Sequence, residues 1–102
     1  MVSYRMWVPQ RQGRSVLHFN DSEITPQSVV QVAATEATDL GPPVFVGQNW
    51  GVLIGAASIT VENVCVRDGG VDFVVNVDWS SPLNVSTDIT ILDPPAQYIV
   101  GS

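Results

Sequence analysis

The alternation of residues 71–79 constrains the fold of this chain more than any other feature. Every second position from the first is Val or Phe, and Trp79 ends the series. A period of two is the period of a β-strand that buries one face. Residues 58–67 are also rich in β-formers, and the Asp-Gly-Gly at 68–70 suits the positive φ of a tight turn. The sequence therefore predicts an antiparallel hairpin with a defined core face.

The first strand of this hairpin, residues 58–67, contains an irregularity. Its apolar residues change phase midway, because Ile59 and Val61 lie on one face of a regular strand and Val64 and Val66 lie on the other. Such a slip predicts either a β-bulge near Asn63 or a strand buried on both faces. Residues 85–92 alternate again after a Ser-Pro turn. We therefore expect residues 58–92 to form a three-strand meander.

The first twenty residues predict a second pair of strands. Residues 2–8 alternate between two faces, and residues 15–19 form a short, largely apolar run. Gly13 between them suits a turn position with positive φ. The expected opening hairpin displays Arg11 and Arg14 at its tip.

Residues 26–40 carry the signals of an amphipathic helix. Thr25 is the expected N-cap, Pro26 suits the first helical position, and Gly41 followed by two prolines is typical of a helix end. At the helical period, six apolar residues gather on one side: Val29, Val30, Val32, Ala33, Ala37 and Leu40. Glu36 is the one acidic residue inside this apolar arc.

These elements predict a single α+β domain over residues 1–102. One helix, about residues 26–40, is expected to pack on a curved, mainly antiparallel sheet of five to seven strands. Short apolar runs at 44–46 and 52–54 supply further strands. Because one helix covers only one face of such a sheet, the remaining apolar side chains predict contact with another subunit.

Composition excludes several classes of function. The net charge is −6 and the chain has no lysine, which argues against binding to nucleic acid. No apolar run approaches the roughly 20 residues of a membrane span, and the first residues lack the pattern of a secretory signal, so we expect a soluble, cytoplasmic protein. The single cysteine excludes an internal disulfide. No motif indicates a metal or an organic cofactor, and none is expected.

Candidate catalytic groups are few. His18 is the only histidine, and Glu36 is a carboxylate drawn towards an apolar helix face, so the two are candidates for acid and base. Cys65 flanked by valines is expected to be an inert, packed thiol rather than a nucleophile activated by His18. If a pocket lies between helix and sheet, its expected aromatic lining is Tyr4, Phe73 and Trp79.

Four polar side chains raise the alternative of a cation site: Asp72, Asn76, Asp78 and Asp88. Alternate residues of one strand lie about 7 Å apart, whereas calcium ligands converge from a tight loop. A solvated polar face is therefore expected instead.

The remaining candidates indicate an interface. Trp7 on the polar face of its strand and Trp50 between glycines are large aromatics at positions expected to face solvent. Arg5 and Arg11 belong to an amino-terminal segment without acidic residues. We therefore predict a small binding or assembly protein acting through a homo-oligomeric or protein interface. A pocket protein for a small apolar ligand, or an enzyme, is the alternative, and an acidic mimic of nucleic acid is a weaker third.

Overall fold

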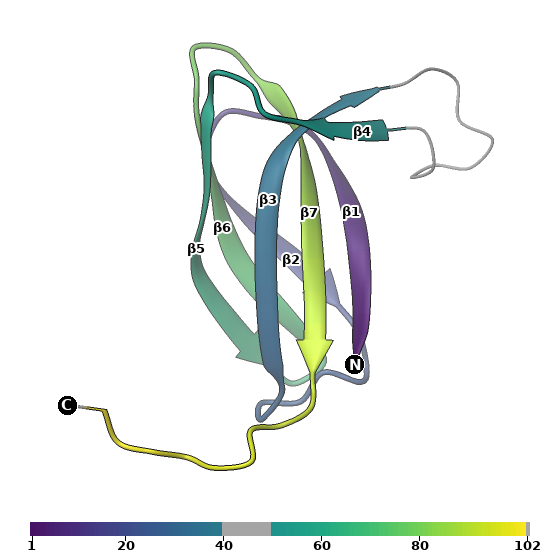
Figure 1. The fold of residues 1–102 in the computed structure, drawn as a ribbon, viewed down its shortest axis with the longest axis vertical. Coiled ribbons are helices and arrows are strands. Elements are labelled where there is room, and N and C mark those ends of the chain that lie inside the picture. The colour runs from purple at the N-terminus through teal and green to yellow at the C-terminus, as the bar shows by residue number, and fades with distance from the viewer. Residues whose placement is uncertain (40–49, 102) are drawn as a thin grey trace.

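The computed structural model describes residues 1–39 and 50–101, and this part of the chain is all-β (Figure 1). Its seven strands form two antiparallel sheets, one of them a curled half-barrel, with no helix in the described residues. Sheet A has the order β1-β7-β3-β4, and sheet B has the order β2-β6-β5. The strands are β1 (Val2–Arg11), β2 (Gly13–Asn20), β3 (Val29–Asp39), β4 (Trp50–Leu53), β5 (Ser58–Arg67), β6 (Gly70–Asp78) and β7 (Leu83–Leu92).

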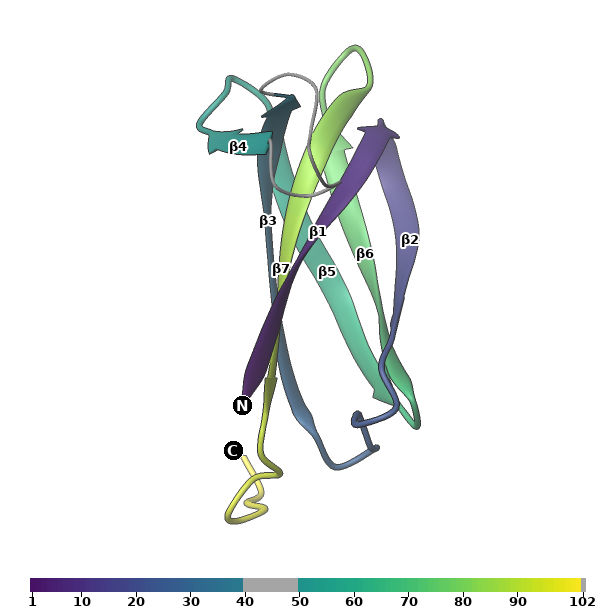
Figure 2. The same ribbon diagram turned by 90° about the vertical axis from the view of Figure 1, so that its right-hand side faces the viewer.

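The core lies between the two sheets, which Figure 2 shows as separate layers. β6 and β7, the central strands that face each other, supply most of it. In β6 every second residue from Val71 to Val77 is buried, and in β7 the inward positions are Val85, Thr87, Ile89 and Ile91. Thr87 is also fully buried, and its hydroxyl donates to the Met6 carbonyl at 3.3 Å, so this polar group is satisfied. The fully or almost fully buried apolar residues are Val8, Leu17, Ile24, Ala37, Val71, Phe73, Val75, Val77, Val85, Ile89 and Ile91.

The predicted helix at 26–40 is wrong, and with it the α+β class. Residues 29–39 form β3, which pairs with β7 and with β4. Val30, Val32 and Ala34 pack against the core, so the segment satisfies a period of two as well as the helical one. Its β-branched residues favour the strand, and pairing on both sides stabilises it. The expected helix end at Gly41 and the expected strand at 44–46 lie outside the described residues.

The residues expected to begin the helix form a tight turn instead. The Ser28 amide donates to the Thr25 carbonyl, and the Thr25 amide donates to the Ser28 hydroxyl, both at 3.0 Å. The second bond, from a backbone amide to the side chain three residues on, also forms in the capping box of a helix, but here it closes an isolated turn. Ile24, just before this turn, is fully buried, and its carbonyl accepts from the Gly69 amide at 2.8 Å. The turn therefore joins the β5–β6 turn through this hydrogen bond and closes one end of the core.

The β5–β6 hairpin is confirmed, together with the bulge in its first strand. Gly69 has φ of 82°, and Asn63 has φ of 53° where the register shifts between Glu62 and Cys65. The extra residue returns Val66 to the core side. Trp79, expected on the core face, lies beyond the end of β6 and is 43% exposed.

The opening hairpin and the three-strand meander are wrong. β1 pairs with β7, and β2 pairs with β6, so the chain crosses from one sheet to the other between β1 and β2. It crosses again between β6 and β7, near a Ser-Ser-Pro turn. Gly13 does take a positive φ, 68°, but at a crossover between sheets. Local turn signals marked the places where strands end and not the strands that pair.

Candidate functional site

The two predicted acid–base groups do not meet. His18 lies on the outer face of sheet B, with its side chain 62% exposed, and Nδ1 is 2.7 Å from Asp72 Oδ1. Glu36 is half-buried in sheet A, opposite Val85 on β7 and Leu53 on β4. Each lines a different shallow pocket. Without a helix there is no helix–sheet cavity to hold them together.

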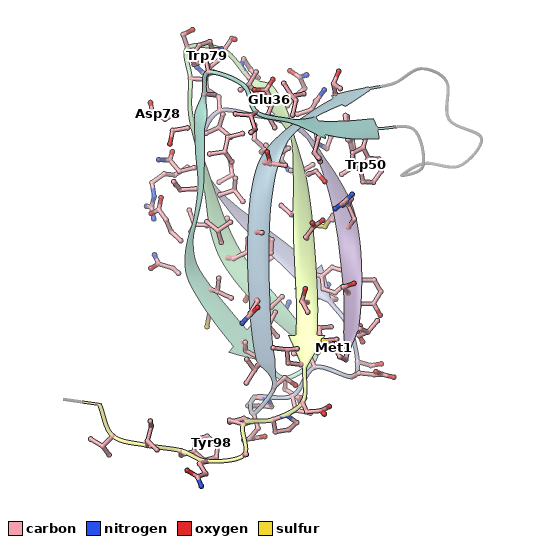
Figure 3. All side chains as sticks on the ribbon, in the orientation of Figure 1. Met1, Glu36, Trp50, Asp78, Trp79 and Tyr98 are labelled. Atoms are coloured by element: carbon pink, nitrogen blue, oxygen red, sulfur yellow. The ribbon has the colours of Figure 1, made fainter. Side chains whose placement is uncertain are left out.

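The surroundings of Glu36 form a small, closely packed corner at the top of the sandwich (Figure 3). The pocket there is about 140 Å³ and is lined by β3, β4 and the start of β5. The Glu36 carboxylate lies so close to Gly55 that a Cβ at this glycine would clash with it. The lack of a side chain at Gly55 therefore makes room for Glu36.

His18 belongs to a row of polar groups across sheet B. Asp72 on β6 is opposite His18 on β2 and opposite Cys65 on β5. Arg67 Nε donates to both Asp72 oxygens, at 3.2 and 3.0 Å. The Arg67 guanidinium first, and the His18 imidazole second, hold the pKa of Asp72 below its usual value. The row is a cross-strand network on an outer face, in which Asp72 contacts both Arg67 and His18.

The Cys65 thiol is exposed and not packed as expected, and the same row separates it from His18. Neighbouring strands lie about 4.8 Å apart, so two strand spacings, about 10 Å, separate the Cys65 and His18 backbones. Activation of a thiol by a histidine needs direct hydrogen-bond reach. Here Asp72 stands between the two residues.

The two predicted interface tryptophans, Trp7 and Trp50, meet on the outer face of sheet A. The rings of Trp7 and Trp50 lie 5.4 Å apart at 48°. Trp50 Nε1 donates to the Ser86 hydroxyl at 3.1 Å, although β3 lies between β4 and β7. Both tryptophans are half-buried, and Ser86 is only 2% exposed. The rings thus pack on each other and on the sheet.

The two predicted interface arginines also make contacts inside the chain. Arg5 donates two hydrogen bonds to the Asp88 carboxylate, from Nε at 2.7 Å and from Nη2 at 3.0 Å. This bidentate contact lowers the pKa of Asp88. Arg11 donates to the Pro9 carbonyl at 3.0 Å. Asp88 lies on sheet A and Asp72 on sheet B, so the residues weighed for a cation site are not gathered.

The predicted pocket aromatics lie in three environments. Phe73 is 1% exposed in the core, whereas Tyr4 and Trp79 are 40% and 43% exposed. Tyr4 contacts Phe19, with ring centroids 5.0 Å apart. Tyr4 lines a pocket beside Arg5 and Asp88, and neither Phe73 nor Trp79 lines that pocket or the β1–β2 cleft.

Sequence reasoning missed a cleft between β1 and β2. These strands are the adjacent edges of the two sheets, and no backbone pairing joins them. The cleft has a volume of about 260 Å³. Its walls are Met6, Trp7 and Val8 on β1, and Val16, Leu17 and His18 on β2, with Arg11 at one end. The signal for it is nonlocal, because it depends on which strands stay unpaired.

A second feature is the trailing segment, residues 93–101, which follows β7. It has no regular structure, and Figure 1 shows it leaving the sandwich on the side away from β1. Tyr98, Ile99 and Val100 are 75%, 85% and 99% exposed. These residues pair with no strand of their own chain.

Comparisons with models of protein families, with curated proteins and with solved structures find no match for this chain. In residues 1–39 and 50–101, no three His, Cys, Asp or Glu side chains gather as a metal-binding group would. No helix in the described part of the chain is long and apolar enough to cross a membrane.

Proposed function

We propose that this chain is a β-sandwich assembly module, which acts by binding further copies of itself rather than through a catalytic site. The observation that carries the proposal is the exposure of three consecutive large side chains, Tyr98, Ile99 and Val100, at 75%, 85% and 99%. A single exposed apolar residue is ordinary, but a contiguous group commonly marks an interaction site.

The free energy of burial supports an interface at this segment. Burying a valine or isoleucine side chain is favourable by about 1.5–3 kcal/mol. The trailing segment gains almost none of this within its own chain, because its apolar side chains remain in water. A partner surface that covers them would recover this free energy.

The competing pocket or enzyme function has less support. His18 and Glu36, its acid and base, line different pockets in different sheets. The β1–β2 cleft, at about 260 Å³, is below the range of about 300–1,000 Å³ that is usual for small-molecule sites. A pocket of about 370 Å³ lies within this range, but its lining of Ser3, Tyr4, Arg5, Asp88 and Thr90 is mostly polar, whereas ligand sites are mostly apolar. A role of Arg5, Trp7, Arg11 and Trp50 in the interface stays a prediction, and their contacts inside the chain leave less of their surface free for a partner.

The test is the mass in solution, measured by light scattering from about 1 µM to about 500 µM, a range that detects dissociation constants in the micromolar region. The proposal expects the mass to rise reversibly with concentration. A mass that stays at 11.0 kDa over the whole range contradicts it.

A further inference from the structure

We infer that the free edge of β2 accepts residues 97–101 of a second copy as an added strand. This inference rests on the proposed self-association and names its two surfaces. The donor is the trailing segment, and the acceptor is the β2 edge beside the β1–β2 cleft.

The donor segment has the composition of a β-strand but belongs to neither sheet of its own chain. Gln97 to Gly101 contains three consecutive β-formers and neither charge nor proline. The two prolines at 94 and 95 prevent a direct continuation of β7, because proline lacks the N–H that a ladder needs. Figure 3 shows Tyr98 on the segment outside the sandwich. The segment is therefore extended and available to another chain.

The acceptor is identified by how the other edges are protected. β4 has only four residues, β5 carries the bulge at Asn63, and β1 contains Pro9 with a register shift beside it. Short length, bulges and proline are devices that prevent an edge from pairing. β2 has none of them, since all eight of its residues pair with β6 in one continuous register. Its outer edge is the most regular one that the described residues offer.

The side chains beside this edge fit an apolar strand best on the cleft side. An added strand would alternate between the cleft, where Met6 and Leu17 lie, and the outer face, where Val16 is 62% exposed between Arg14 and His18. Tyr98 and Val100 share one face of such a strand, and Ile99 takes the other. The face turned towards the cleft would meet apolar neighbours.

Three other pockets lined by described residues fit the donor less well. They contain carboxylates, from Asp88, Glu36, Glu23 or Asp93, which disfavour an uncharged apolar segment. Net charge does not select the β2 edge, because Arg5, Arg14 and His18 each contact a carboxylate of a neighbouring strand.

The experiment compares three full-length variants by light scattering and sedimentation. The donor variant replaces Tyr98, Ile99 and Val100 by serine. The acceptor variant is Val16→Lys, and Val64→Lys is its matched control, because Val64 is also exposed, at 40%, but lies on the β5 side of the same sheet. Circular dichroism checks that each variant folds, and the donor variant alters only exposed residues outside the strands.

The donor and acceptor variants should each weaken self-association about tenfold or more, whereas the control should change it by less than about twofold. Mixing the donor and acceptor variants should restore a 1:1 complex, since each retains one working surface. If the unchanged chain associates and both variants associate equally well, the β2 inference is overturned while the assembly proposal stands. If the unchanged chain remains monomeric, both are overturned.

Discussion

The two edges of sheet B differ although both strands pair with β6. β5 is interrupted by the bulge at Asn63, whereas β2 keeps one register along its whole length. Ion pairs involve both edge strands, with Arg14 on β2 3.1 Å from Glu62 on β5 and Arg67 on β5 3.0 Å from Asp72 on β6, so charge alone does not distinguish them. The difference lies in the backbone, which remains regular enough on β2 to pair with another strand.

The strand common to both edges, β6, should give the largest effect on stability. Phe73 is 1% exposed between the sheets, so Phe73→Ala leaves a cavity and should lower the free energy of unfolding by about 3–5 kcal/mol, measured by urea denaturation. Val74→Ala, on the outer face of the same strand, is the control and should cost less than about 1 kcal/mol. Equal losses for the two variants would contradict the assignment of the core face.

The bulge that distinguishes β5 can be tested at its strained residue. Asn63 has φ of 53°, a left-handed conformation that asparagine tolerates and β-branched residues do not. Asn63→Val should lower the free energy of unfolding by about 1–2 kcal/mol. Asn63→Gly relieves the same restriction and should cost little. A valine tolerated as well as glycine would mean that the bulge does not hold this conformation.

The ion pairs that join both edges should have the smallest effect, and it should depend on pH. Because Arg67 and His18 lower the pKa of Asp72, the carboxylate stabilises the folded state fully above its unfolded pKa of about 3.9. This stabilisation is lost as the pH falls through the lower folded pKa. Asp72→Asn should therefore lower the urea midpoint slightly at pH 7.

The control for this prediction is the same pair of proteins at a pH below the folded pKa of Asp72. There both carry an uncharged group at residue 72, and the difference in midpoint should shrink. A difference that is constant between neutral and acidic pH would show that the ion pairs do not contribute through the charge of Asp72.

The sequence predicted the strands whose signals are local. β6 alternates strictly, and its hairpin with β5 closes over residues adjacent in the chain, so both the core face and the bulge could be read. The strand β3 could not be predicted from the sequence, because its apolar residues fit the helical period and the strand period equally. The choice was decided by β7, a partner about 55 residues away.

The candidate site also combines local and nonlocal features. Residues 98–100 form an apolar run in the sequence, but the cleft at β2 exists because the chain crosses between the sheets after β1. The contact of Trp7 with Trp50 likewise depends on sheet order, since β7 and β3 lie between their strands. His18 and Glu36 were expected in one cavity only because a helix was expected over a sheet.

Amide hydrogen exchange of the unmodified chain, followed residue by residue by NMR at about 10 µM and at about 500 µM, tests the acceptor edge most directly. The backbone amides of β2 that point away from β6 should exchange about tenfold more slowly at the higher concentration, while the outer amides of β5 keep the same rate. Unchanged exchange along β2 in a sample whose mass has risen would contradict the account, because the copies would then meet through another surface.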